Sequence, residues 1–150
     1  MPSTARETAE RFLTATTGAD PGDLADCYAP HTVIEMPFAP PALHPARTET
    51  DRESLRARFR AGAAVRRYER VTGATVHETA DPEVVIVEYD LHGRLLAGGE
   101  PFTLSFLMVM TVRDGLIVHT RDYADPIAGA TALGRLPELL EALAAAGQYS

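Results

Sequence analysis

The second half of the chain alternates apolar and polar side chains with a period of two, which is the pattern of strands that bury one face. This alternation predicts four strands, over residues 71–79, 83–93, 102–112 and 116–124. Turn-forming pairs separate these strands: Asp81-Pro82, Gly98-Gly99 and Asp114-Gly115. The last pair is the strongest short hairpin signal in the chain, so we expect the strands to form an antiparallel meander.

Helical spacing, in which apolar side chains recur every three or four residues, governs the first part of the chain and its C-terminal end. Two capping boxes predict helix starts: Thr4 with Glu7 and Thr50 with Glu53. We expect the first helix to end near Gly18. Asp20-Pro21 then opens a short second helix, which we expect Pro30 to end. A final helix follows residues 125–126.

One more strand, over residues 31–36, lies between the second and third of these helices. The prolines within residues 37–50 cannot donate to a strand ladder, so we expect this stretch to form an extended surface loop. Helices set apart from a meander of strands indicate an α+β fold with the helices on one face of the sheet. The length of 150 residues fits a single domain over residues 1–150.

Composition and charge narrow the possible chemistry. The formal net charge of −7 argues against nucleic-acid binding, because phosphate backbones require a concentrated basic surface. All 14 basic residues are arginine, which excludes a Schiff base on lysine. The single cysteine, the lack of a signal-peptide pattern and the lack of a long apolar stretch favour a cytoplasmic protein that does not bind membranes. No metal-ligand spacing or phosphate loop is present, so we expect no metal and no cofactor.

Four short segments carry a resemblance to a known family: Glu-Met-Pro-Phe-Ala-Pro-Pro at 35–41, Glu-Tyr-Asp-Leu-His-Gly-Arg at 88–94, Arg-Asp-Gly-Leu-Ile at 113–117 and Arg-Asp-Tyr-Ala-Asp-Pro at 121–126. With them the chain resembles the SnoaL-like family of the nuclear transport factor 2-like, or ketosteroid isomerase-like, superfamily. The resemblance implies a curved antiparallel sheet forming a cone-shaped barrel, three N-terminal helices, one C-terminal helix, a deep apolar pocket and a homodimer. This fold hosts isomerases, cyclases, dehydratases, epoxide hydrolases and non-enzymes, so function must be argued from the site.

Asp122 is the first candidate for a catalytic residue. Alternation along the last strand places Asp122 on the same face as Val118 and Thr120, and this face of small side chains suits a pocket wall. In the similar limonene-1,2-epoxide hydrolases the aspartate of the Arg-Asp-Tyr run faces the pocket, which implies the same for Asp122. Desolvation in an apolar cavity raises the pKa of a carboxyl group toward neutrality, where it can serve as an acid or a base.

The predicted strand over residues 83–93 has two faces, one with Glu88, Asp90 and His92 and the other with Val87, Tyr89 and Leu91. The pattern alone favours the apolar face as core, because charged side chains are rarely buried. The resemblance implies the reverse: related epoxide hydrolases carry an inward Arg-x-Asp here, in which Asp90 matches the aspartate and Glu88 replaces the arginine. His92 would then be a proton shuttle beside Asp90, with an ordinary turn histidine as the alternative.

Glu35, at the end of the strand over residues 31–36, is a further candidate, because related enzymes place a polar group near this point. An exposed strand-end glutamate is the alternative. We expect the pocket wall and the substrate contacts to come from Phe12, Val33, Phe38, Phe59, Leu104, Phe106, Met108 and Thr120, although most of this set also fits an ordinary core. The oxyanion donors of ketosteroid isomerase fall on Phe12 and near Met108, which argues against steroid isomerisation.

These observations lead to the hypothesis of a cofactor-independent isomerase or cyclase that acts on a hydrophobic, polyketide- or terpenoid-like metabolite. Asp122 would move a proton, Asp90 or His92 would donate one, and Glu35 and Glu88 would tune the site. Two alternatives stay open: an epoxide hydrolase of the limonene-epoxide type, and a non-catalytic module that binds a ligand or dimerises.

Overall fold

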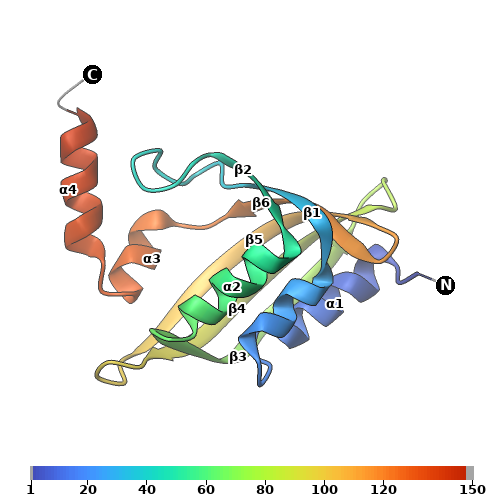
Figure 1. The fold of residues 1–150 in the computed structure, drawn as a ribbon, viewed down its shortest axis with the longest axis horizontal. Helices are drawn as coiled ribbons and strands as arrows, with labels where there is room; N and C mark the ends of the chain where they lie inside the picture. Colours follow the sequence, from blue (N-terminus) through green and yellow to red (C-terminus); the bar gives the residue numbers. More distant parts are fainter. Residues whose placement is uncertain (1, 148–150) are drawn as a thin grey trace.

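A single curved sheet of six strands dominates the structure, which is a computed structural model describing residues 2–147 (Figure 1). The strands are β1 (Tyr28–Glu35), β2 (Arg47–Asp51), β3 (Arg66–Glu78), β4 (Val84–Leu95), β5 (Pro101–Arg113) and β6 (Leu116–Tyr123). Their order is β2-β1-β6-β5-β4-β3, and only the β1–β6 pair is parallel. The predicted α+β class and curved sheet are confirmed, with a cone that stays open between its edge strands β2 and β3.

Helices cover the concave face of this sheet and extend the chain beyond it (Figure 1). They are α1 (Ala5–Ala15), the short 3₁₀ helix η1 (Pro21–Cys27), α2 (Arg52–Gly62), α3 (Pro126–Ala132) and α4 (Leu136–Gly147). The first capping box is confirmed, because the Thr4 hydroxyl accepts from the Glu7 amide and the Glu7 carboxylate accepts from the Thr4 amide. Asp51, rather than Thr50, caps α2 by accepting from the Ser54 amide.

Two predictions around the first strand are wrong. Pro30 does not end η1; it lies inside β1, in the interval between Tyr28 and Val33 where the β1–β6 register shifts and a missing backbone donor is tolerated. The predicted surface loop over residues 37–50 contains most of β2, which pairs antiparallel with β1. Its exposed, polar sequence lacks the apolar alternation that marks the other strands.

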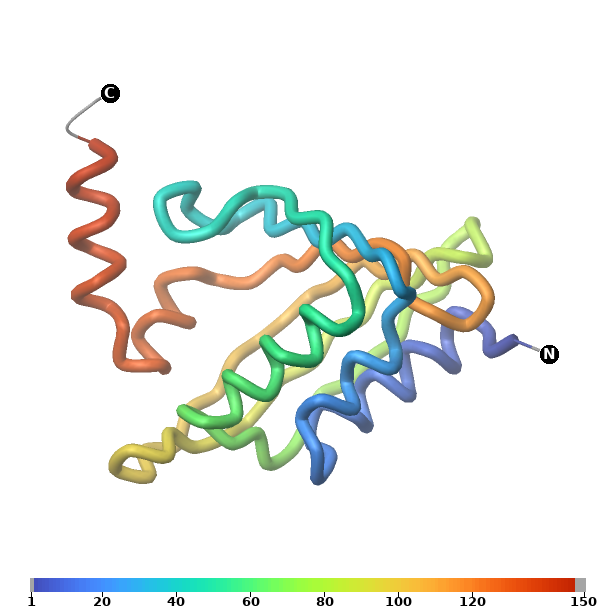
Figure 2. The backbone as a smooth tube through the Cα atoms, viewed as in Figure 1, coloured from blue at the N-terminus to red at the C-terminus, as the bar shows by residue number. Residues whose placement is uncertain are grey.

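The C-terminal segment forms two helices where the sequence predicts one. Asp125 caps α3 by accepting from the Ile127 and Ala128 amides. Gly134, with φ of 71°, follows α3 in the left-handed conformation that glycine adopts most easily, and the chain turns there into α4. Figure 2 shows this segment at the end of the molecule opposite the N-terminus.

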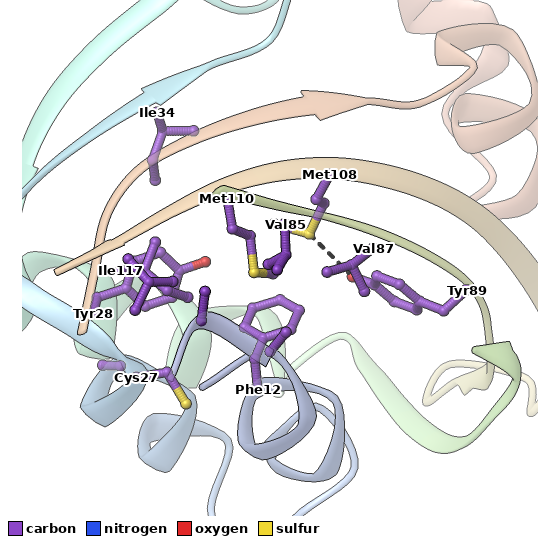
Figure 3. Close-up of a cluster of buried hydrophobic side chains, with 14 of the residues drawn as sticks. Phe12, Cys27, Tyr28, Ile34, Val85, Val87, Tyr89, Met108, Met110 and Ile117 are labelled. Carbon is purple, nitrogen blue, oxygen red and sulfur yellow. Dashed lines mark hydrogen bonds between the residues drawn. The ribbon is translucent and has the colours of Figure 1, made fainter. Parts of the chain in front are cut away.

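The predicted hairpin at Asp114-Gly115 is confirmed and joins β5 to β6. Both residues have positive φ, 52° and 76°, as a tight two-residue hairpin requires. In the core, inward side chains of β4 and β5, such as Val87 and Met110, pack against Phe12 of α1 (Figure 3). All three are at most 3% exposed.

Candidate active site

A cavity of about 1070 Å³ lies between the concave face of the sheet and the surrounding helices. Strands β1, β3, β4, β5 and β6 supply one wall, and α1, η1 and α2 supply another. The loop after β1 and the α3–α4 segment also line the cavity. Apolar side chains such as Leu55, Phe59 and Phe106 make up much of the lining. The volume is large enough for a small-molecule ligand.

Asp122 is the carboxylate that β6 contributes to this cavity, at the position paired with Met108 of β5. Its Oδ1 atom is buried and has no hydrogen-bond partner within residues 2–147. Burial raises the pKa of Asp122 to about 6, and the neighbouring Thr120 hydroxyl and the Arg58 guanidinium oppose part of this rise. The placement agrees with the predicted orientation of Asp122, whose catalytic role stays a prediction.

Three tyrosines line the cavity with Asp122, and two of them, Tyr28 and Tyr89, are buried. In the view of Figure 3, Tyr28 and Tyr89 lie on opposite sides of Phe12 and the methionines of β5. Burial raises the pKa of both phenols well above the usual value, and the charge of Asp122 raises it further, so both remain protonated donors. The Tyr89 hydroxyl donates to the Met108 sulfur at 3.5 Å. The Tyr28 hydroxyl forms no hydrogen bond among the described residues; the Arg52 guanidinium donates to the Tyr28 backbone carbonyl instead.

The predicted inward orientation of Glu88, Asp90 and His92 is wrong. Tyr89 and Leu91 occupy the concave face of β4 with exposures of 6% and 3%, so the alternating polar side chains project from the outer face. There the Ser105 hydroxyl donates to Asp90 at 2.6 Å.

The other two polar side chains of this strand also have partners on the outer face. Glu88 pairs with His77 at 2.7 Å. His92 hydrogen-bonds to the hydroxyls of Thr72, at 2.7 Å, and Thr103, at 3.0 Å. None of the three lines the cavity that holds Asp122, so the structure does not bring the predicted proton donor together with the predicted base.

Glu35 and Val33 also lie outside the main cavity, contrary to the prediction. Both line a smaller hollow of about 430 Å³ on the outer face, together with His119. The Glu35 carboxylate contacts the His119 imidazole at 3.1 Å and lies 3.9 Å from the Arg121 guanidinium. Val118 lines this hollow too, because an irregular register between β5 and β6 displaces it from the face of Asp122.

The predicted apolar wall divides into two groups. The residues that line the main cavity are Phe12, Phe59, Leu104, Phe106 and Met108. Phe38 does not line it: the ring is 64% exposed and packs edge-on against Tyr123. Thr120 is fully buried behind Asp122 and affects that carboxylate without lining the cavity.

Sequence reasoning missed Tyr28, Tyr89 and Arg58. The sequence pattern placed Tyr28 in the short second helix that Pro30 was expected to end, whereas this residue begins β1. Tyr89 lies on the opposite face of its strand from Asp90. The apolar pattern predicted that Tyr89 faces inward, whereas the family resemblance implied that Asp90 does. Arg58 belongs to the otherwise exposed polar side of α2, which gives no sign that the guanidinium reaches a cavity.

Within residues 2–147 no group of three or more histidine, cysteine, aspartate or glutamate side chains could hold a metal ion. Among the same residues, no helix is long and apolar enough to cross a membrane. The titratable side chains that line the cavity are Asp122, Asp125, Glu138, His44, Tyr28, Tyr68, Tyr89 and four arginines. Asp122, Tyr28 and Tyr89 are the ones whose pKa values burial shifts most.

The fold and the cavity define a class: an α+β protein whose curved sheet wraps around a hollow large enough for a small molecule. The chain belongs to the SnoaL-like domain family, whose model matches residues 9–120.

Comparisons with individual proteins agree with this assignment. An uncharacterised PhzA/B-like protein from Pseudomonas aeruginosa is 33% identical over 109 residues, covering 73% of this chain and 75% of that protein. A solved structure from Bacillus subtilis, provisionally named an isomerase, is 28% identical, with a TM-score of 0.76 over 87% of this chain and 93% of that chain.

More distant structures share the fold alone. A protein from Pseudomonas putida, provisionally named a polyketide cyclase, is 16% identical, with a TM-score of 0.71 over 87% of this chain and 98% of that chain. A limonene-epoxide-hydrolase-like epoxide hydrolase from Mycobacterium tuberculosis is 21% identical, with a TM-score of 0.63 over 97% of this chain and 96% of that chain.

Proposed function

We propose that the cavity binds a hydrophobic small metabolite and that Asp122 transfers a proton within it, without a cofactor, in an isomerisation or cyclisation. The observation that carries this proposal is the buried, unpartnered oxygen of Asp122 in a large, mainly apolar cavity. A carboxyl group with a pKa of about 6 is ionised near neutral pH and is a stronger base than an exposed aspartate.

In the first step, Asp122 would remove a proton from a carbon next to a substrate carbonyl group. The electron pair of the broken C–H bond forms an enolate, and the Tyr28 phenol donates a hydrogen bond to its oxygen. For an isomerisation, Asp122 returns this proton to a different carbon. For a cyclisation, the enolate carbon forms a bond to a second carbonyl carbon of the substrate, and the oxygen of that carbonyl takes the proton from Asp122.

Tyr28 gives this cavity an oxyanion donor of its own. Phe12 and Met108 stand where the family resemblance puts the donors of ketosteroid isomerase, and both line the cavity with apolar side chains. The Tyr28 phenol keeps its proton because burial raises its pKa, and it has no competing hydrogen bond within residues 2–147. Tyr28 is therefore proposed as the hydrogen-bond donor to the enolate oxygen, and Asp122, in place of Asp90 or His92, returns the proton.

Two other functions are less well supported. Epoxide opening by activated water uses an inward Arg-x-Asp on the strand equivalent to β4, and here Glu88 and Asp90 both project from the opposite face. A ligand-binding protein without activity would use the same cavity, but it does not require the raised pKa of Asp122. The predicted homodimer and the absence of nucleic-acid and membrane binding stay predictions.

The experiment that tests the proposal begins with mass spectrometry of any molecule that co-purifies with the protein, which supplies a substrate candidate. Asp122→Asn should lower turnover of this substrate by about 10²–10⁴-fold, the usual contribution of a general base. Asp90→Asn, the matched control on the outer face, should retain activity. Wild-type turnover should rise with pH through about 6 as Asp122 ionises.

Equal turnover by Asp122→Asn and the wild type would contradict the proposal. A ligand that is bound tightly but released unchanged by the wild type would assign the cavity to a carrier.

A further inference from the structure

Some arginines of the chain form salt bridges with carboxylates, and others do not. The arginines that form salt bridges with carboxylates are Arg6, Arg47, Arg56, Arg60, Arg94, Arg113, Arg121 and Arg135. Arg58, Arg66 and Arg67 form none within residues 2–147, although the chain has 21 acidic residues, and all three line the main cavity. Arg67 alternates with Arg66 along β3, so its side chain projects from the opposite face of that strand, and Arg58 and Arg66 are the pair considered further. Two guanidinium groups without a counter-charge thus face a cavity in a protein of net charge −7.

Arg58 belongs to α2 and Arg66 to β3, and both side chains lie along one face of α2. Arg58 and Gly62 are four residues apart in α2 and therefore lie on the same face of the helix. The Arg66 side chain lies directly against Gly62, where its Nη2 atom is 3.0 Å from the position that a Cβ atom would take. Arg66 therefore follows Arg58 along the face of α2 that lines the cavity.

The orientation of Arg66 is fixed by a tyrosine of the same strand. Its Nε atom donates to the Tyr68 hydroxyl at 2.8 Å, and its guanidinium carbon lies 5.6 Å from the centre of that ring. This arrangement uses the Nε donor and leaves the two Nη groups for another acceptor. A preorganised guanidinium of this kind is suited to bind a carboxylate with paired hydrogen bonds.

The acidic residues that line the cavity do not neutralise this pair. Asp125 uses Oδ1 to cap α3, and Glu138 pairs with Arg135 at 2.9 Å. Asp122 is the remaining acid of the lining, and the charge of Arg58 lowers the pKa of Asp122 only in part, because burial dominates. Arg58 therefore faces the same space as the proposed base without forming a salt bridge to it.

We propose that the ligand of this cavity is an apolar molecule that carries a carboxylate, and that this carboxylate binds between Arg58 and Arg66. The apolar body would lie across Leu104 and Phe106 toward Asp122. This inference rests on the part of the proposed function that has the cavity bind a small molecule. It does not depend on proton transfer by Asp122.

A pair of probes that differ only in charge tests the proposal: 2-naphthoate and its neutral primary amide, each titrated into the full chain at pH 8 by calorimetry. Wild-type protein should bind the acid at least about tenfold more tightly than the amide, because charge-assisted hydrogen bonds to arginine form only with the acid. The double variant Arg58→Gln with Arg66→Gln should bind the two probes within about twofold of each other. Arg70→Gln, which removes the same charge from β3 at a residue paired with His92, should keep the preference.

Equal affinity of the wild type for the two probes, persistence of the preference in the double variant, or binding of neither probe would each overturn the proposal. Circular dichroism checks the fold of the double variant. If that variant does not fold, the test uses Arg58→Gln alone, which lies at an exposed position of α2. This single variant should bind the acid more weakly than the wild type does and should bind the amide equally well. Asp122→Asn should retain the preference for the acid. If turnover does not depend on Asp122 while this preference holds, the catalytic proposal fails and the anion site stands.

Discussion

Asp122 and Asp90 lie on strands separated only by β5, yet they face opposite sides of the sheet and have different surroundings. Asp90 pairs across the ladder with Ser105, whose hydroxyl satisfies it at 2.6 Å on the outer face. Asp122 pairs with Met108 and keeps one oxygen buried without a hydrogen bond. The comparison shows that the face of the sheet, rather than the residue type, decides which aspartate is suited to proton transfer.

The apolar neighbours determine that face. Along β4 the alternate residues Val87, Tyr89 and Leu91 fill the concave side, and burial of their surface fixes the strand in this register. Turning Asp90 inward would expose all three and bury charges in their place. The match of Asp90 to a family motif does not compensate for this loss of apolar burial.

The largest effect on stability that the comparison predicts concerns β5, which separates the two aspartates. Met110 is fully buried on the concave side, whereas Val109 is half-buried on the outer side. Met110→Ala should lower the free energy of unfolding by about 2–5 kcal/mol, because it leaves a cavity in the core. Val109→Ala should cost less than about 1 kcal/mol. Urea denaturation measures both, and equal losses would show that the two faces do not differ as described.

A smaller effect links Asp122 to the pH dependence of stability. Its pKa in the folded protein, about 6, lies above the ordinary value of 3.8, so the fold favours the neutral carboxyl group. This contribution is complete below about pH 3.8 and is lost as pH rises through 6. At pH 8 the ionised form therefore costs at most about 3 kcal/mol relative to a carboxylate in water.

Asp122→Asn, which stays neutral, should gain stability relative to wild type as the pH rises from 4 to 8. Urea denaturation at several pH values measures this difference, and Asp90→Asn on the outer face is the matched control. A difference between wild type and Asp122→Asn that stays constant over this range would argue that Asp122 is solvated.

The sequence predicts most of the fold because local signals and burial agree along the meander. The alternation over residues 83–93 and 102–112 and the Asp114-Gly115 turn lead to β4, β5 and their hairpin partner with small errors at the ends. The failures occur where the local signal is weak or misleading. Edge strand β2 is exposed and polar, and Pro30 looks like a helix end although it lies in β1.

The candidate site could be predicted only in part. Alternation within one strand placed Asp122, but Tyr28 and Arg58 reach the same cavity from other elements, which only tertiary packing brings together. For Asp90 the apolar pattern favoured the orientation that the structure has, and the family resemblance pointed to the opposite one. Physical pattern was thus the better guide to orientation, while the resemblance was the better guide to the family.

The most direct test of the central claim is the titration of the Asp122 carboxyl carbon by ¹³C NMR, with its signal assigned by its loss in Asp122→Asn. Burial in the cavity predicts a midpoint at about pH 6. A midpoint near 3.8, the ordinary value for aspartate, would show that water solvates this carboxylate and would contradict the assignment of Asp122 as the proton-transfer group.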